Sequence, residues 1–223
     1  PNALNADDML RVLDALREAF CIQDHAEISV ELDPRTLGPD MIHALAAGGV
    51  TRASLGVQDF NRTVQEAINR VQPFLLVEGA VEALRKAEIN AINFDLLYGL
   101  PHQTTESVAK SAELAASLNP DRISAFGYAH VPWFAKHQRA IDERHLPGSE
   151  ARFAQYHALG ETLVACGYTQ IGLDHFAKED DELSLALSKG QLHRNFQGYT
   201  TDTCRTLIAL GPSGISEFPG GFA

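Results

Sequence analysis

Short apolar or β-branched runs alternate with longer amphipathic stretches along most of the chain. The longer stretches repeat apolar residues at helical spacing, which predicts helices over residues 7–20, 39–47, 61–69, 73–88, 104–118 and 149–166. The short runs predict strands over 28–32, 52–57, 91–98, 122–128 and 168–173, and a last apolar run covers 206–210. This alternation is typical of an α/β protein with repeated β/α units on a mainly parallel sheet. An unclosed β/α barrel and an open doubly wound sheet would both satisfy it.

Polar or ionisable residues stand at the end of every predicted strand. In chain order they are Glu31 and Asp33, Gln58 and Asp59, Asp95 and Tyr98, Tyr128 and His130, and Asp174 and His175. Both candidate folds bind ligands at the carboxyl ends of their strands. Any one of these residues would fit a solvent-exposed strand end, but their occurrence at all five ends predicts a shared site.

The charge balance narrows the classes of ligand and partner. The 223 residues hold 18 Lys and Arg against 29 Asp and Glu, a net charge of −11, and the pI is near 5.2. Nucleic acids and anionic membranes attract basic surfaces, so we expect neither as a general partner. No long apolar run or secretory signal is readable, and the widely spaced Cys21, Cys166 and Cys204 fit neither disulfides nor a metal site. These features predict a reduced, cytoplasmic protein.

Common catalytic motifs are missing from the sequence. GxGxxG, GxxxxGKS/T, GxSxG and HExxH do not occur. His130 and His137 are seven positions apart with a proline between them, so we expect satisfied or solvated histidines. His175 fits either a catalytic acid or base or a histidine bonded to its neighbour Asp174. Arg70 fits either a fork for a carboxylate or phosphate or a solvated arginine at a helix end.

Five strings carry a resemblance to a known family. They are VELDP at 30–34, LGVQDFN at 55–61, INR at 68–70, NFDLLYGLP at 93–101 and LHRNFQGYTT at 192–201. Through them, and over about residues 1–216, the sequence resembles the oxygen-independent coproporphyrinogen III oxidases, which are radical S-adenosylmethionine (SAM) enzymes of haem biosynthesis. Haem-trafficking relatives share three of the patterns, whereas HRNFxGYT is more discriminating and favours the oxidases.

The resemblance implies a partial, three-quarter β/α barrel that binds a 4Fe–4S cluster and SAM. In that family the reduced cluster cleaves SAM to a 5′-deoxyadenosyl radical, which removes a hydrogen atom from the β-carbon of two propionates of coproporphyrinogen III in turn. Each propionate then loses CO2 and becomes a vinyl group, which yields protoporphyrinogen IX. The implied partners are this substrate and an electron donor to the cluster, and the whole enzyme is expected to be a monomer.

The family's motifs also assign roles to residues of this chain. By resemblance, Glu31 holds one SAM through its ammonium group, and Ile215 makes an apolar contact with the same molecule. Gln58, Arg70, Asp95 and Ala129 match positions that bind a second SAM. The charged residues among them suit this ligand, because arginine pairs with carboxylates and aspartate pairs with ammonium or ribose hydroxyl groups.

The sequence departs from the family at both ends. The Cys-x3-Cys-x2-Cys loop and the Gly-Gly-Thr-Pro motif are missing, although Pro1 fits the last residue of that motif, and the C-terminal helical region is missing as well. We therefore expect residues 1–223 to be the central part of one radical SAM barrel domain, inactive by itself, with incidental cysteines that hold no cluster. Two alternatives stay open: a haem-trafficking relative, and an unrelated β/α barrel enzyme with another ligand at the same strand ends.

Overall fold

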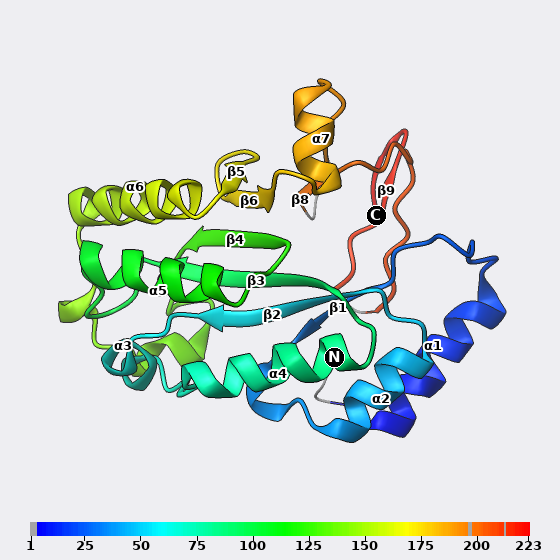
Figure 1. Cartoon of the computed structure of the whole chain (residues 1–223), viewed down its shortest axis with the longest axis horizontal. Coiled ribbons are helices and arrows are strands. Elements are labelled where there is room, and N and C mark those ends of the chain that lie inside the picture. Colours follow the sequence, from blue (N-terminus) through cyan, green and yellow to red (C-terminus); the bar gives the residue numbers. More distant parts are fainter. Residues whose placement is uncertain (1–3, 196–197, 212) are drawn as a thin grey trace. The chain divides into compact units, whose positions relative to one another are not determined.

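The computed structural model describes residues 4–195, 198–211 and 213–223 (Figure 1). Pro1 and the central Phe196 and Gln197 of the HRNFxGYT string lie outside the described residues. The contacts divide the chain into two compact units, residues 1–179 and 180–223. None of the described helices combines the length and the apolar character needed to cross a membrane.

The first unit alternates helices and strands as the sequence predicts. Its elements are α1 (Ala6–Ala19), β1 (Ser29–Leu32), η1 (Pro34–Thr36), α2 (Pro39–Ala47), β2 (Arg52–Gln58), α3 (Arg62–Ala67), α4 (Phe74–Lys86), β3 (Ala91–Tyr98), α5 (Thr105–Ser117), β4 (Arg122–Gly127), η2 (Lys136–Ala140), η3 (Glu143–His145), α6 (Ser149–Ala165), β5 (Tyr168–Gln170) and β6 (His175–Lys178). Asn61 caps the amino end of α3, because its side chain accepts a hydrogen bond from the Thr63 N–H at 2.9 Å.

The six strands form one sheet in the order β1-β2-β3-β4-β6-β5. β1 to β4 are parallel and follow one another in sequence, and Figure 1 shows α4 and α5 running along them. A doubly wound sheet would reverse its strand order and carry helices on both faces, whereas this order does not reverse between β1 and β4. The partial-barrel interpretation is therefore confirmed.

The predicted strand over 168–173 is wrong in its second half. β5 ends at Gln170, and the chain then turns so that β6 pairs antiparallel with both β5 and β4. The Ile171 N–H donates to the carbonyl of His175 at 2.8 Å and closes the turn, which contains Gly172. Because β6 runs against β4, it begins at the edge where β4 ends, so Asp174 and His175 still lie at that edge.

Side-chain alternation places the core between the sheet and its helices. Leu55 of β2, Phe94 of β3 and Ile123 of β4 are fully buried and occupy neighbouring positions across the sheet. They belong to one apolar cluster with helix residues such as Leu84 and Leu163. The opposite face of the same strands is free to carry polar side chains.

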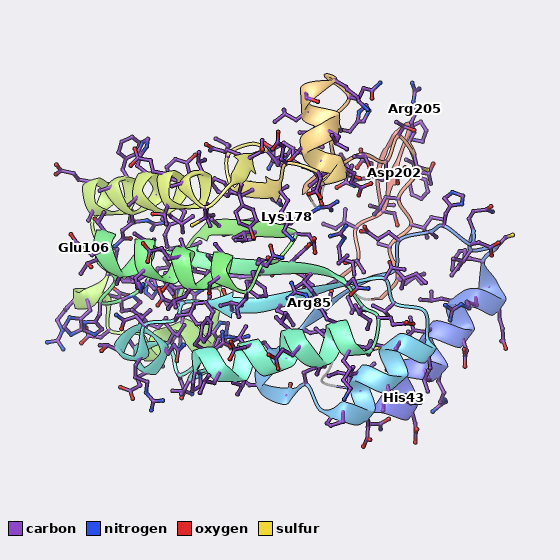
Figure 2. All side chains as sticks on the ribbon, in the orientation of Figure 1. His43, Arg85, Glu106, Lys178, Asp202 and Arg205 are labelled. Carbon is purple, nitrogen blue, oxygen red and sulfur yellow. The ribbon has the colours of Figure 1, made fainter. Side chains whose placement is uncertain are left out.

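The amino ends of β3 and β4 are held by polar side chains that act within the fold. Arg85 of α4 donates to the carbonyl of Asn119 at 2.7 Å, and Lys178 lies 3.4 Å from the Asp121 carboxylate. Arg85 and Lys178 are labelled in Figure 2. Asp121 also accepts a hydrogen bond from the Ile92 N–H at 2.8 Å. These groups satisfy one another, so this edge serves stability rather than ligand binding.

The second unit contains α7 (Glu182–Ser188), β7 (His193–Asn195), β8 (Gly198–Thr200), β9 (Glu217–Phe218) and β10 (Gly221–Phe222). β7 pairs with β8 and β9 pairs with β10, both antiparallel. The apolar run at 206–210 is not a regular strand, because only Leu207 forms a bridge, with Glu217. Short polar hairpins of this kind give little periodic signal, which is why the sequence did not predict them.

Candidate functional site

A row of polar positions crosses the helix-free face of the sheet. Strand register aligns Gly56 of β2, Asp95 of β3, Ser124 of β4 and His175 of β6. Their neighbours along each strand, such as Phe94, point to the buried helix side. Because side chains alternate between the two faces of a strand, the polar positions that looked scattered in the sequence gather on one surface.

Asp95 is the central group of this row. The Ser54 hydroxyl donates to its carboxylate at 3.3 Å, and the Ser124 hydroxyl is a second hydrogen-bond partner. Burial, followed by the negative charge of Glu31, raises the pKa of Asp95 from 3.8 to about 6, although the two serines and His175 act in the opposite direction. The hydrogen bonds and the nearby histidine do not fully offset the loss of hydration of this carboxylate. Such a group favours a ligand with cationic or hydroxyl groups.

Glu31 lies on β1, at the edge of the same sheet, and faces the same surface as Asp95. It pairs in register with Ser54 across β1 and β2, and its side chain is exposed. The negative charge of Glu31 raises the pKa of Asp95, so the two carboxyl groups lie within electrostatic range of each other. The structure therefore brings these two predicted site residues together.

Arg70 is a half-buried fork rather than a solvated arginine at a helix end. Its Nη1 donates to Asp33 at 3.1 Å and its Nη2 donates to the carbonyl of Gly56 at 2.8 Å. Its Nε is buried and has no hydrogen-bond partner within the described residues. Burial lowers the pKa of Arg70, and the Asp33 carboxylate opposes that effect. A guanidinium with an unsatisfied donor is suited to a further anionic or carbonyl ligand.

Gln58 meets Arg70 above Gly56. The register of β2 against β3 shifts between Gly56 and Gln58, and Gln58 takes a left-handed backbone conformation with φ of 68°. A Cβ atom on Gly56 would lie 2.9 Å from Gln58 Nε2 and 3.1 Å from Arg70 Nη2. Glycine at position 56 therefore provides the space in which the two side chains approach each other.

Asp59 has a structural role, contrary to its prediction as a member of the shared site. It is fully buried and accepts hydrogen bonds from Gln103 Nε2 at 2.6 Å and Ser111 Oγ at 3.1 Å. Gln103 also accepts from the Leu100 N–H at 2.7 Å and donates to the carbonyl of Leu97 at 2.8 Å. Burial raises the pKa of Asp59. This network fixes the carboxyl ends of β2 and β3 and so positions the residues that follow them.

Ala129 lies beyond β4 in a loop at the same edge of the sheet. Its carbonyl accepts a hydrogen bond from Gln138 at 3.1 Å. The flanking Tyr128 and His130 side chains bond to each other at 3.0 Å, and His130 also bonds to Glu143 at 2.9 Å. His130 is thus a satisfied histidine, as predicted, and its bonds hold the backbone around Ala129.

His175 is bonded to its neighbour, the second of the two predicted alternatives. Its Nδ1 lies 2.7 Å from Asp174 Oδ1, and its ring packs edge-on against Phe126 with centroids 5.8 Å apart. The side chain lies on the helix-free face, where its electrostatic interaction with Asp95 opposes the rise in the pKa of that carboxyl group. It therefore contributes to the site's electrostatics.

The remaining predicted site residue is Ile215, and the chain holds three cysteines. Ile215 belongs to the second unit, where it is 40% exposed, and its role stays a prediction. Cys21, Cys166 and Cys204 are exposed free thiols. In the part of the chain that the structure describes, no three His, Cys, Asp or Glu side chains are grouped so as to hold a metal ion. The structure thus offers a polar organic-ligand site without a cluster site among those residues.

Sequence reasoning missed Ser54, Ser124 and Gly56 as members of the site. None stands at a strand end, which was the criterion used. The signal lay in alternation along the strand, because Ser54 and Gly56 are two positions apart in β2 and therefore face the same side.

Comparisons with known proteins point to one class. Residues 3–115 match the family model of the radical SAM superfamily. Over 222 residues the chain is 49% identical to an oxygen-independent coproporphyrinogen III oxidase of Bradyrhizobium diazoefficiens and 43% identical to one of Cereibacter sphaeroides. Each alignment covers 100% of this chain and 49% of the relative. The chain thus spans about half the length of the curated relatives it matches.

A solved structure extends the likeness to three dimensions. Coproporphyrinogen III oxidase from Escherichia coli, described as a radical SAM enzyme, matches with a TM-score of 0.93 and 43% identity. The alignment covers 98% of this chain and 50% of that chain. The described fold is therefore close to about half of that enzyme.

Proposed function

Because the chain belongs to the radical SAM superfamily, we propose that it forms the SAM-binding part of an oxygen-independent coproporphyrinogen III oxidase. The whole enzyme would convert coproporphyrinogen III to protoporphyrinogen IX by oxidative decarboxylation of two propionates. The observation that carries this proposal is the partly buried Asp95 carboxyl group beside Glu31 and the Arg70 fork, in a chain 49% identical to a named oxidase. In this view residues 1–223 are the central part of one barrel domain.

The polar groups on the helix-free face fit the chemistry of SAM. SAM carries an ammonium, a carboxylate, a sulfonium and two ribose hydroxyl groups. Asp95 and Glu31 offer carboxylates for the cationic and hydroxyl groups, and the unsatisfied Arg70 Nε offers a donor for the carboxylate. Gln58, Ala129 and Ile215 complete the proposed set. When bound next to a 4Fe–4S cluster, SAM supplies the radical that starts the reaction.

The residues of this chain do not themselves fit a 4Fe–4S cluster. Such clusters are held by clustered thiolates, and the three exposed cysteines lie in separate parts of the sequence. The role proposed for this chain is therefore to bind and orient SAM. The cluster, its electron donor and the remaining contacts to coproporphyrinogen III belong to the whole enzyme. We propose that this enzyme is a cytoplasmic monomer.

Calorimetric titration of the purified chain with SAM tests the proposal. Asp95→Asn and Arg70→Gln should each weaken SAM binding by roughly tenfold or more, because each removes one partner of a charge-assisted hydrogen bond. Asp14→Asn on the exposed side of α1 and Arg62→Gln on α3 make the same changes in charge away from the site and should bind SAM like wild type. Equal affinity in all five proteins would refute the proposed site.

A chimera tests the activity of the whole enzyme. The matching half of the Escherichia coli oxidase would be replaced by this chain, and protoporphyrinogen IX formed from coproporphyrinogen III would be measured by chromatography. The chimera should be active, and its Asp95→Asn form should lose product formation while its Asp14→Asn form keeps it. A folded, cluster-loaded chimera that makes no product would contradict the oxidase assignment.

A further inference from the structure

A pocket with a mainly apolar lining lies on the helix-covered side of the sheet, between α6 and the carboxyl ends of β3 and β4. It encloses about 580 Å³, and its lining includes Tyr98, Gly127, Arg152, Leu173 and Asp174. None of these residues belongs to the proposed SAM set. The pocket lies wholly within the first unit.

The Arg152 side chain lies across the backbone at two glycines. A Cβ atom on Gly99 would be 3.1 Å from Arg152 Nε, and one on Gly127 would be 3.1 Å from an Arg152 terminal nitrogen. Gly127 stands in register with Tyr98 on β3, and a Cβ there would also be 3.0 Å from the Tyr98 hydroxyl. A larger residue at either position would displace the guanidinium, so both glycines provide a defined seat for it.

Among the described residues this guanidinium has no hydrogen-bond or ion-pair partner, and its charge opposes the rise in the pKa of Tyr98 that burial causes. Throughout residues 4–195, 198–211 and 213–223, no hydrogen bond or ion pair involves the side chain of Arg152. The one acidic residue lining the pocket, Asp174, is bonded to His175 at 2.7 Å. The fold thus holds a partly buried guanidinium in a fixed position without a bonded partner. Such a group is suited to bind a carboxylate of a ligand, because its planar shape presents two parallel N–H donors to the two carboxylate oxygens.

Apolar and aromatic groups surround this cation. The rings of Tyr98 and Tyr156 pack with their centroids 5.8 Å apart, and Phe153 and Leu173 are 65% and 67% exposed at the pocket. Exposed apolar side chains around one seated cation fit a flat apolar molecule that carries a carboxylate. They fit a small inorganic anion less well, since it would leave those surfaces in contact with water.

From this geometry we infer that Arg152 and its pocket bind a carboxylate of an aromatic or macrocyclic polyacid. The inference rests on the proposed function for its natural ligand, which would be coproporphyrinogen III held by one of its propionates. Asp95 precedes Tyr98 by three residues, about 10 Å along β3. One ring with several propionates can therefore place one at Arg152 while another approaches the helix-free face. The net charge of −11 disfavours nonspecific attraction of a polyacid, so its binding would depend on a local positive charge such as that of Arg152.

Fluorescence titration of the purified chain with coproporphyrin III, the air-stable oxidised form, tests this inference. The wild-type chain should bind it and should bind its tetramethyl ester at least tenfold more weakly. Arg152→Gln should weaken binding by roughly tenfold to a hundredfold, the range for one charge-assisted pair. Arg152→Lys keeps the charge but loses the fork, so its affinity should lie between the two. Arg11→Gln, on the exposed face of α1, is the matched control and should bind like wild type.

The outcomes separate this inference from the proposed function. Melting temperatures would show that each variant is folded, and SAM titrations of the same proteins should be unchanged by Arg152→Gln. If coproporphyrin III fails to bind, or binds Arg152→Gln or the ester equally well, the pocket is not a carboxylate site, whatever SAM does. If SAM fails to bind while the dependence on Arg152 holds, the proposed function fails and the carboxylate site stands.

Discussion

Replacing Asp95 with asparagine should stabilise the ligand-free chain at neutral pH while it weakens SAM binding. The folded protein holds this carboxyl group with a pKa raised from 3.8 to about 6, chiefly by burial. An acid with a raised folded pKa binds its proton more tightly in the folded state. Asp95 therefore lowers stability as pH rises from about 4 to about 6, and the loss is complete above that window.

The magnitude follows from the two pKa values. Their difference of roughly two units, at 1.36 kcal/mol per unit, corresponds to about 3 kcal/mol. The side-chain amide introduced by Asp95→Asn is uncharged, but it accepts fewer hydrogen bonds from Ser54 and Ser124 than the carboxylate does. The expected net gain in the free energy of unfolding at pH 8 is therefore roughly 1–3 kcal/mol.

Urea unfolding at pH 4 and pH 8 measures this effect. The variant's advantage over wild type should be small at pH 4, where folded Asp95 is protonated, and largest at pH 8. Asp14→Asn on the exposed side of α1 is the matched control, and its difference from wild type should stay within about 0.5 kcal/mol at pH 8. Carbon-13 NMR titration of the side-chain carboxyl gives the pKa of Asp95 directly. A midpoint near 4, or a variant less stable than wild type at pH 8, would refute the reasoning.

Three further changes test the surroundings of Asp95. Glu31→Gln removes the nearby negative charge and should lower the pKa of Asp95 measured by the same NMR titration; an unchanged midpoint would contradict the coupling. Gly56→Ala puts a Cβ atom 2.9 Å from Gln58 Nε2, so calorimetry should show SAM affinity reduced by roughly tenfold; wild-type affinity would mean that the close approach is not needed. Gln103→Ala leaves buried polar partners unsatisfied and should cost about 2–4 kcal/mol in urea unfolding, whereas a loss below about 1 kcal/mol would contradict the structural role of this network.

The sequence predicted the β/α order of the first unit because its strands and helices carry strong, different periodicities. β3 was predicted over its observed range, 91–98, and α2 over its observed range, 39–47. The hairpin of β5 and β6 was missed because Gly172 interrupts one apolar run without a change of period. Antiparallel pairing of β6 with β4 depends on tertiary contacts, and no local pattern specifies it.

The site was predicted in part, and its errors have one physical cause. Strand ends were used as the criterion, and they identified Glu31, Gln58 and Asp95 correctly as neighbours. The same criterion assigned Asp59 to the shared site, although this side chain points into the core and bonds to Gln103 and Ser111. Distance from a strand end says where the backbone lies, whereas the direction of a side chain also depends on the parity of its position.

The two faces of β3 explain why such a polar site does not weaken the fold. Phe94 is fully buried in the cluster under the helices, and its neighbour Asp95 lies on the opposite face among Ser54, Ser124 and the charge of Glu31. Apolar burial on one face supplies the stability, since a phenylalanine in such a core contributes about 3–5 kcal/mol relative to alanine. The other face is then free to keep a carboxyl group in an unfavourable ionised state. In the proposed SAM site a cationic ligand would relieve that unfavourable state, so the energy that burial removes from the ligand-free chain would return as affinity for the ligand.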